Sequence, residues 1–134
     1  MTRELLLADK IMKEANDRTG WGFSIKSFKE GYIVGTTIES NGGAVLDIRF
    51  EVQQTEVTIC TILSGLEFDE EKVKQELDLM GSTIEAIEIS DEVVKLERKL
   101  SFIYARNCTA FMVVRLMMPM VEKMLNLIKN RIAA

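Results

Sequence analysis

The sequence predicts an α+β domain: an antiparallel meander sheet of about five strands, with helices packed on one face and a long C-terminal helix. Three observations predict this fold. Apolar residues recur at helical spacing over 2–17, apolar and polar residues alternate between short turns over 21–63, and apolar residues recur at spacings of three and four near the end. A chain of 134 residues holds one core, so we expect a single domain, 1–134.

Residues 2–17 predict an amphipathic first helix. One face of this helix is expected to hold Leu5, Ala8, Ile11, Met12 and Ala15. The polar run from Asn16 to Gly20 is typical of a helix end, since its residues favour turns.

Residues 21–63 predict four consecutive strands. Asn41-Gly42 is a strong hairpin signal, because both residues tolerate a positive φ. In the strand that follows, every second residue is apolar, which indicates one buried and one wet face. The apolar residues of that strand are Ala44, Leu46, Ile48, Phe50 and Val52.

An acidic helix of about a dozen residues is expected after Phe68. Asp69 is the predicted N-cap, with Glu70 and Glu71 at the positive end of the helix dipole, and Gly81 is the predicted end. The inward face is expected to hold Val73, Leu77 and Met80. The isoleucine-rich segment 83–89 predicts a fifth strand.

Residues 91–105 fit two interpretations. Ser90, followed by Asp91 and Glu92, is typical of a helix start, so a helix over 91–105 is favoured. The rival is a hairpin in which residues 94–102 alternate, Arg106-Asn107 turns and 109–117 returns as a strand. Pro119 would then open a final helix, whereas within one long helix it would introduce a kink. Residues 120–131 are helical in both interpretations.

The segment 110–124 is apolar at almost every position, which is more than one helix face buries in a lone small domain. Five of the eight methionines fall in it, and methionine adapts easily to different apolar partners. We predict that the segment is a dimer seam or a client groove, with plain core as the alternative. The candidate residues are Phe111, Val114, Met117, Met118, Val121, Met124 and Leu125.

The residue inventory predicts no enzyme and no catalytic residue. Histidine, the commonest general base, is absent. Glu85 and Glu88 are three residues apart, on opposite faces of a regular strand, so they do not form an obvious acid dyad. Cys60 has no cationic neighbour in sequence that would activate a thiolate. Helix capping accounts for the acids near Asp69, so no metal and no cofactor are expected.

The charge distribution disfavours nucleic acid as a partner. Seventeen basic and twenty-one acidic residues give a net charge of −4, and residues 65–92 carry −8 against +6 for 93–134. These charges are either solvated faces or an acidic and a basic face that meet across a dimer. The apolar run Leu5–Ala8 is too short for a signal segment, and Arg115 interrupts the longest one. We therefore expect a cytoplasmic protein with no membrane partner.

The order of elements resembles that of small chaperone-like α+β proteins, including class I type III secretion chaperones and the YbjN-like domains. The shared features are acidic charge, size, a leading helix with Glu4-Leu5-Leu6-Leu7, the meander, the acidic helix from Asp69 and the amphipathic helix from Met120. This resemblance implies an acidic homodimer that holds a partly extended protein segment without catalysis. The extra strand before the middle helix departs from it, as does a long helix over 91–131.

Taken together, these patterns predict a non-enzymatic, cytoplasmic protein-binding module, a homodimeric chaperone-like or adaptor protein with an unknown protein client. The alternative is a carrier or sensor of a small apolar ligand held between the sheet and the C-terminal helix, which requires a preformed cavity.

Overall fold

The computed structural model describes residues 2–40, 42–79, 81–101 and 110–133. The elements are α1 (Arg3–Thr19), β1 (Ser24–Phe28), β2 (Gly31–Glu39), β3 (Val45–Gln53), β4 (Glu56–Ser64), α2 (Glu70–Leu77), β5 (Glu85–Ile89), β6 (Val94–Ser101) and α3 (Ala110–Ala133). Within the described ranges the strands form one antiparallel sheet of order β1-β2-β3-β4-β6-β5. The α+β class and the long C-terminal helix are confirmed, but the sheet has six strands rather than about five.

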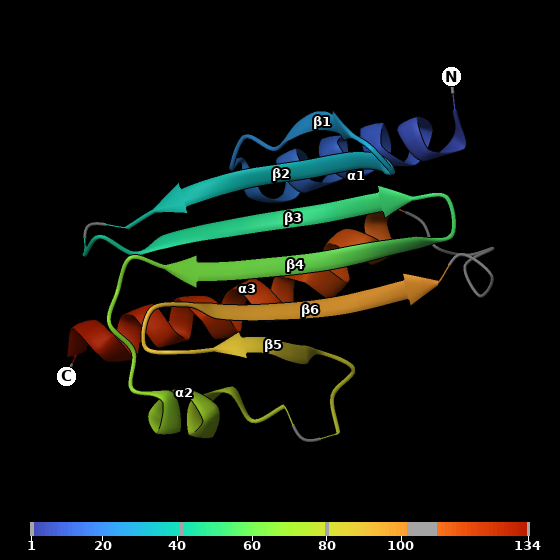
Figure 1. The fold of residues 1–134 in the computed structure, drawn as a ribbon. Coiled ribbons are helices and arrows are strands. Elements are labelled where there is room, and N and C mark those ends of the chain that lie inside the picture. Colours follow the sequence, from blue (N-terminus) through green and yellow to red (C-terminus); the bar gives the residue numbers. More distant parts are fainter. Residues whose placement is uncertain (1, 41, 80, 102–109, 134) are drawn as a thin grey trace.

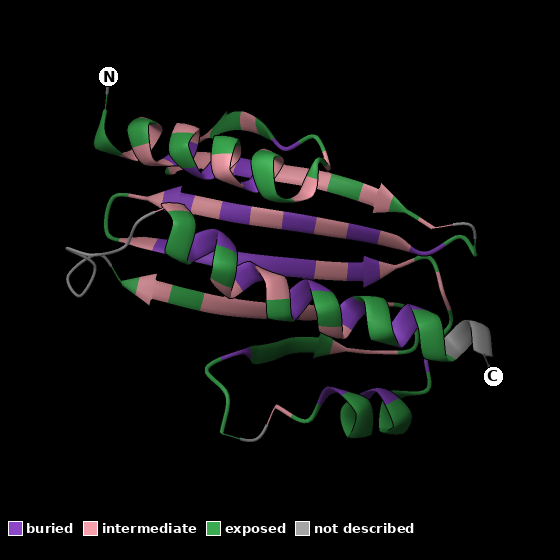
Figure 2. Cartoon of the chain, turned by 180° about the vertical axis from the view of Figure 1, so that it is seen from behind, coloured by how far each residue is buried: buried purple, intermediate pink, exposed green. Residues whose placement is uncertain are grey.

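The molecule has two layers (Figures 1 and 2). Helices α1 and α3 lie on the same face of the sheet, with α1 over β1–β3 and α3 over β4. No described helix covers the opposite face, which we call the open face. The short helix α2 lies beyond the β5 edge, and the Lys123 ammonium of α3 donates to the Leu77 carbonyl at its end, at 2.9 Å.

Helix α1 ends close to where the sequence predicts. The Thr2 hydroxyl accepts from the Leu5 N–H at 3.2 Å, which satisfies one of the free donors of the first turn. At the other end the Gly20 N–H donates to the Asn16 carbonyl at 2.8 Å, with Gly20 in the left-handed region at φ +71°. The first strand begins at Ser24 rather than at residue 21, after Gly22 at φ +79°.

Strand β3 confirms the predicted alternation. Leu46, Ile48, Phe50 and Val52 are buried beneath the helices, while the residues between them lie on the open face. Part of the Asn41-Gly42 turn lies outside the described residues, since Asn41 is one of those left out. The hairpin around it is closed by the Ser40 N–H, which donates to the Ala44 carbonyl at 2.9 Å.

The helix predicted over 91–105 is wrong: residues 94–101 form strand β6. Val94, Leu96 and Leu100 alternate onto the helix-covered face, and β6 pairs with β4 on one side and β5 on the other. The Ser90 hydroxyl accepts from the N–H groups of Glu92 (3.2 Å) and Val93 (3.0 Å), as an N-cap would, but here it closes the turn between β5 and β6.

The rival hairpin interpretation is correct only in its first half. Its Arg106-Asn107 turn lies outside the described residues. The returning strand predicted over 109–117 is wrong, because α3 begins at Ala110. Pro119 therefore lies inside α3 and not at the start of a final helix.

Helix α2 is shorter than predicted. Asp69 is its N-cap, as expected, and accepts from the N–H groups of Glu71 (3.1 Å) and Lys72 (3.3 Å). The helix has eight residues and ends at Leu77, with Asp78 as its C-cap at φ +37°, rather than at Gly81. A short polar residue such as aspartate tolerates this left-handed conformation. Val73 and Leu77 are buried as predicted, and Met80 lies outside the described residues.

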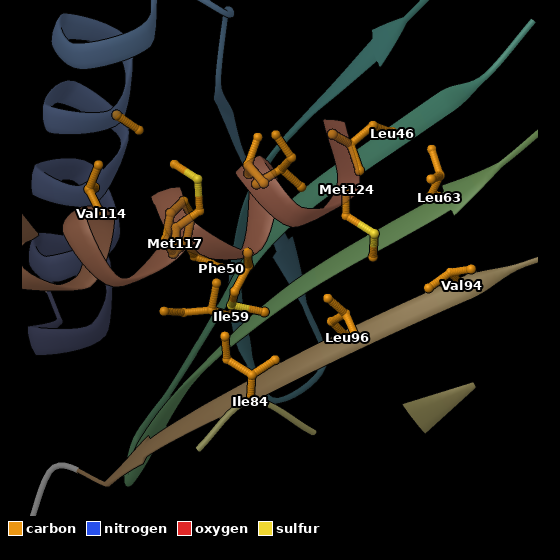
Figure 3. Packing of buried hydrophobic residues seen from close by; sticks show 14 of the residues in the cluster. Leu46, Phe50, Ile59, Leu63, Ile84, Val94, Leu96, Val114, Met117 and Met124 are labelled. Carbon is orange, nitrogen blue, oxygen red and sulfur yellow. The ribbon is translucent and has the colours of Figure 1, made fainter. Parts of the chain in front are cut away.

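The core lies between α3 and the sheet. In Figure 3, Met117 and Met124 of α3 project toward the sheet, where Phe50 and Ile59 come from β3 and β4 and Leu96 from β6. Val114 lies on the side of α3 next to α1. This packing fixes the rotation of α3 about its own axis, and thereby decides which of its residues face outward.

Candidate functional site

The inner side of α3 accounts for four of the seven predicted site residues. Val114, Met117, Val121 and Met124 are buried in the core of a single protomer, together with Val113, Met120, Leu127 and Ile128. The sheet and α1 supply their cover. None of these four side chains is exposed in this structure.

The other three predicted residues are not fully buried, although Met118 packs in part against the core. Phe111 is 49% exposed and Leu125 is 42% exposed, while Met118 between them is half-buried. They lie seven residues apart, which is close to two helical turns, so they form one line about 21 Å long on α3. In Figure 2, which looks onto the helix-covered face, buried and exposed segments alternate along α3.

Two opposite charges alternate with these apolar side chains. Arg115 lies one turn after Phe111, and Glu122 lies one turn after Met118. Both are exposed, and neither forms an ion pair within the described part of the chain. They are about 10 Å apart along the helix axis, too far to pair with each other in one helix. We call these five residues the α3 stripe: Phe111, Arg115, Met118, Glu122 and Leu125.

A side chain of helix α1 contacts one end of the α3 stripe. The Arg18 guanidinium lies over the Phe111 ring, 4.9 Å from its centroid, and is also 3.7 Å from the Glu14 carboxylate. A cation–π contact at such an exposed position contributes about 0.5–1 kcal/mol. The Phe111 ring is therefore presented in a defined position at the surface.

Exposed large apolar residues elsewhere are solitary. In the described ranges, Leu6 on α1 is 46% exposed and Ile87 on β5 is 47% exposed, whereas α3 carries Phe111, Met112 and Leu125. Single exposed apolar residues are ordinary on protein surfaces, and a cluster carries more information. Leu6 and Ile87 are therefore matched controls for tests of the α3 stripe.

The open face of the sheet has a hollow of about 450 Å³ above Gly35, which has no side chain to fill it. Lys26 and Arg49 bring positive charge to its wall, and the Thr37 hydroxyl donates to the Asp47 carboxylate at 2.6 Å. The hollow is open to solvent and its lining is mainly polar. An apolar ligand needs a largely enclosed apolar cavity instead.

The Cys60 thiol lies in an environment that does not activate it. Burial raises the pKa of the Cys60 thiol to about 11, an effect that the nearby Lys95 charge only partly opposes. The thiol therefore stays protonated at neutral pH, and a protonated thiol is a poor nucleophile. Among the described residues, no three histidine, cysteine or acidic side chains converge as a metal site would require.

The predicted placement of Glu85 and Glu88 on opposite faces of the strand is wrong. A β-bulge lies between Ala86 and Glu88, so Glu85 pairs with Glu97 and Glu88 pairs with Lys95. Since residues 95 and 97 share a face of β6, the two glutamates share the open face. Both side chains are exposed.

Sequence reasoning missed two members of the α3 stripe, Arg115 and Glu122. The signal was present, because each follows an apolar member of the line by four residues.

Within the described residues, the helices lack the combination of length and hydropathy needed to span a membrane. Comparison with known protein families, curated proteins and solved structures finds no match to this chain.

Proposed function

We propose that this chain is a non-enzymatic protein-binding module of the chaperone or adaptor type, acting in the cytoplasm, and that the α3 stripe is its contact surface. The observation that carries the proposal is the line of Phe111, Met118 and Leu125 on a helix whose inner side is already fully packed. Such a line with a seven-residue repeat suits a helix of another polypeptide laid along it.

The expected energetics suit a specific but reversible contact. Covering the exposed part of each apolar side chain contributes on the order of 1 kcal/mol, since full burial of such a side chain contributes about 1.5–3 kcal/mol. Arg115 and Glu122 add orientation more than affinity, because exposed ion pairs contribute little energy while opposed like charges are costly.

The alternative of a small apolar ligand between the sheet and α3 has less support. That layer is occupied by Met117, Met120 and Met124, each fully buried. The hollow on the open face is polar and lies on the other side of the sheet. A native mass spectrum that shows a copurified apolar molecule would restore this alternative.

Site-specific photo-cross-linking in the native cell tests the proposal. p-Benzoylphenylalanine in place of Leu125 should form a covalent adduct with a polypeptide, because this position lies on the α3 stripe. The same group in place of Ile87, which is equally exposed on β5, should form none. If position 125 yields no polypeptide adduct, the proposed function is wrong.

A further inference from the structure

We propose that the partner of the α3 stripe is a second copy of this chain, with the two α3 helices packed antiparallel about a twofold axis next to Met118. This inference rests on the proposed function, because it uses the same surface. It adds the identity of the partner and the orientation of the two helices.

The charges of the stripe are arranged symmetrically. Arg115 and Glu122 lie at equal distances on either side of the midpoint between Met118 and Pro119. If two α3 helices run antiparallel about an axis through that midpoint, Arg115 of each copy lies at the level of Glu122 of the other. Both charges have no ion-pair partner within the described part of their own chain, and the dimer supplies one to each.

The apolar residues obey the same symmetry. Phe111 and Leu125 lie seven residues to either side of Met118. Their centre differs from that of the charges by half a residue, which is less than about 1 Å along a helix axis. One twofold axis therefore sets Phe111 against Leu125 of the other copy and Met118 against its own counterpart. A self-complementary patch of this kind is the signature of an isologous interface.

A parallel arrangement does not satisfy these charges. It would set Arg115 beside Arg115 and Glu122 beside Glu122, and like charges placed opposite one another are destabilising. An unrelated partner could also bind the stripe. Binding to such a partner would not require that the stripe match a second copy of itself. The observed symmetry therefore favours a second copy over an unrelated protein.

The stripe is narrow, so the dimer is expected to be weak. Stable interfaces bury about 800 Å² on each partner, and one side of one helix supplies only part of that area. We expect a dissociation constant on the order of micromolar, so the full chain should be dimeric at about 100 μM and largely monomeric when diluted about a thousandfold.

Charge reversal tests the arrangement by sedimentation equilibrium on the full chain. Arg115→Glu and Glu122→Arg should each weaken self-association by about a hundredfold. Each substitution replaces the two attractive pairs across the axis with two pairs of like charges. An equimolar mixture of the two variants should form a heterodimer, since both cross-axis pairs are then attractive. The double variant should dimerise like the wild type. Lys10→Glu, an exposed reversal on α1, should change nothing.

The outcomes separate this inference from the proposed function. Monomeric single variants that stay monomeric when mixed, or single variants that still dimerise, would refute the antiparallel arrangement. A wild-type chain that is monomeric at 100 μM, together with an adduct to a different polypeptide at position 125, would overturn the inference and leave the proposed function standing. The expected adduct at position 125 is a second copy of this chain, at twice its mass.

Discussion

The two sides of α3 are built from similar residues but stand in opposite environments. Met117 on the inner side is fully buried against the sheet, and Met118, the next residue, belongs to the outward stripe. The composition of the helix alone does not distinguish them. Burial is decided by the rotation of the helix on the sheet, and exposed apolar residues become informative only once that rotation is known.

The largest effect is expected from placing a charge on each side in turn. Met117→Glu would bury a carboxylate without a partner, at a cost comparable to the whole stability of a small domain, about 5–15 kcal/mol, so the chain should not fold. Met118→Glu should leave the fold intact and abolish self-association. Circular dichroism and sedimentation measure the two outcomes. A folded Met117→Glu protein would show that the inner side is less constrained than described.

Truncation to alanine should affect stability more on the inner side of α3 than on its outer side. Met124→Ala leaves a cavity in the core and should lower the free energy of unfolding by about 2–5 kcal/mol. Leu125→Ala, at the neighbouring outward position, should lower it by only about 0.5 kcal/mol. Urea unfolding of dilute protein, where association is negligible, gives both values. Equal losses at the two positions would contradict the assignment of sides.

Substitution of Pro119 tests whether α3 is a continuous helix that lacks one backbone hydrogen bond at this position. Proline inside a helix cannot donate a hydrogen bond to the carbonyl four residues earlier, here that of Arg115. Pro119→Ala restores that donor at an exposed position and should raise the free energy of unfolding by about 1–2 kcal/mol, after the greater freedom of the unfolded chain is subtracted. Thermal unfolding measures the gain, and an unchanged or lower midpoint would argue against a continuous α3.

The last prediction is an effect confined to high pH, and it concerns a residue that is buried without any helix above it. Cys60 lies on the open face, and burial raises its pKa to about 11 from an ordinary value of 9.0. Above pH 9 the unfolded chain releases this proton before the folded one does, so Cys60 should lower stability progressively between pH 9 and 11. Urea unfolding of the wild type and of Cys60→Ala across this range should show a difference that grows with pH. A difference independent of pH would place the thiol in contact with water.

Sequence patterns predicted the elements whose signals are local. The alternation in β3 and the N-cap Asp69 depend on residues a few positions apart, and both were predicted correctly. Strand β6 was predicted as a helix, because the Ser90 hydroxyl makes the same hydrogen bonds in a turn as at a helix start. What decides the matter is pairing with β4 and β5, and β4 lies more than thirty residues away in the sequence.

The candidate site shows the same limit. The spacing of apolar residues correctly predicted a helix over 120–131, but several lines along α3 are apolar, and only the packing against Phe50 and Ile59 shows which line faces inward. The β-bulge that brings Glu85 and Glu88 to one face has no signal in their spacing.

That bulge also bears on how the protein behaves at high concentration. An exposed sheet edge offers unpaired N–H and C=O groups on which further strands can grow into fibres. The irregularity in β5 disrupts the regular ladder at one edge, and the opposite edge, β1, is only five residues long and carries Lys26. Both are devices that hinder edge-to-edge aggregation. The sheet is thus a poor template for its own extension, which directs any self-assembly to the helical layer.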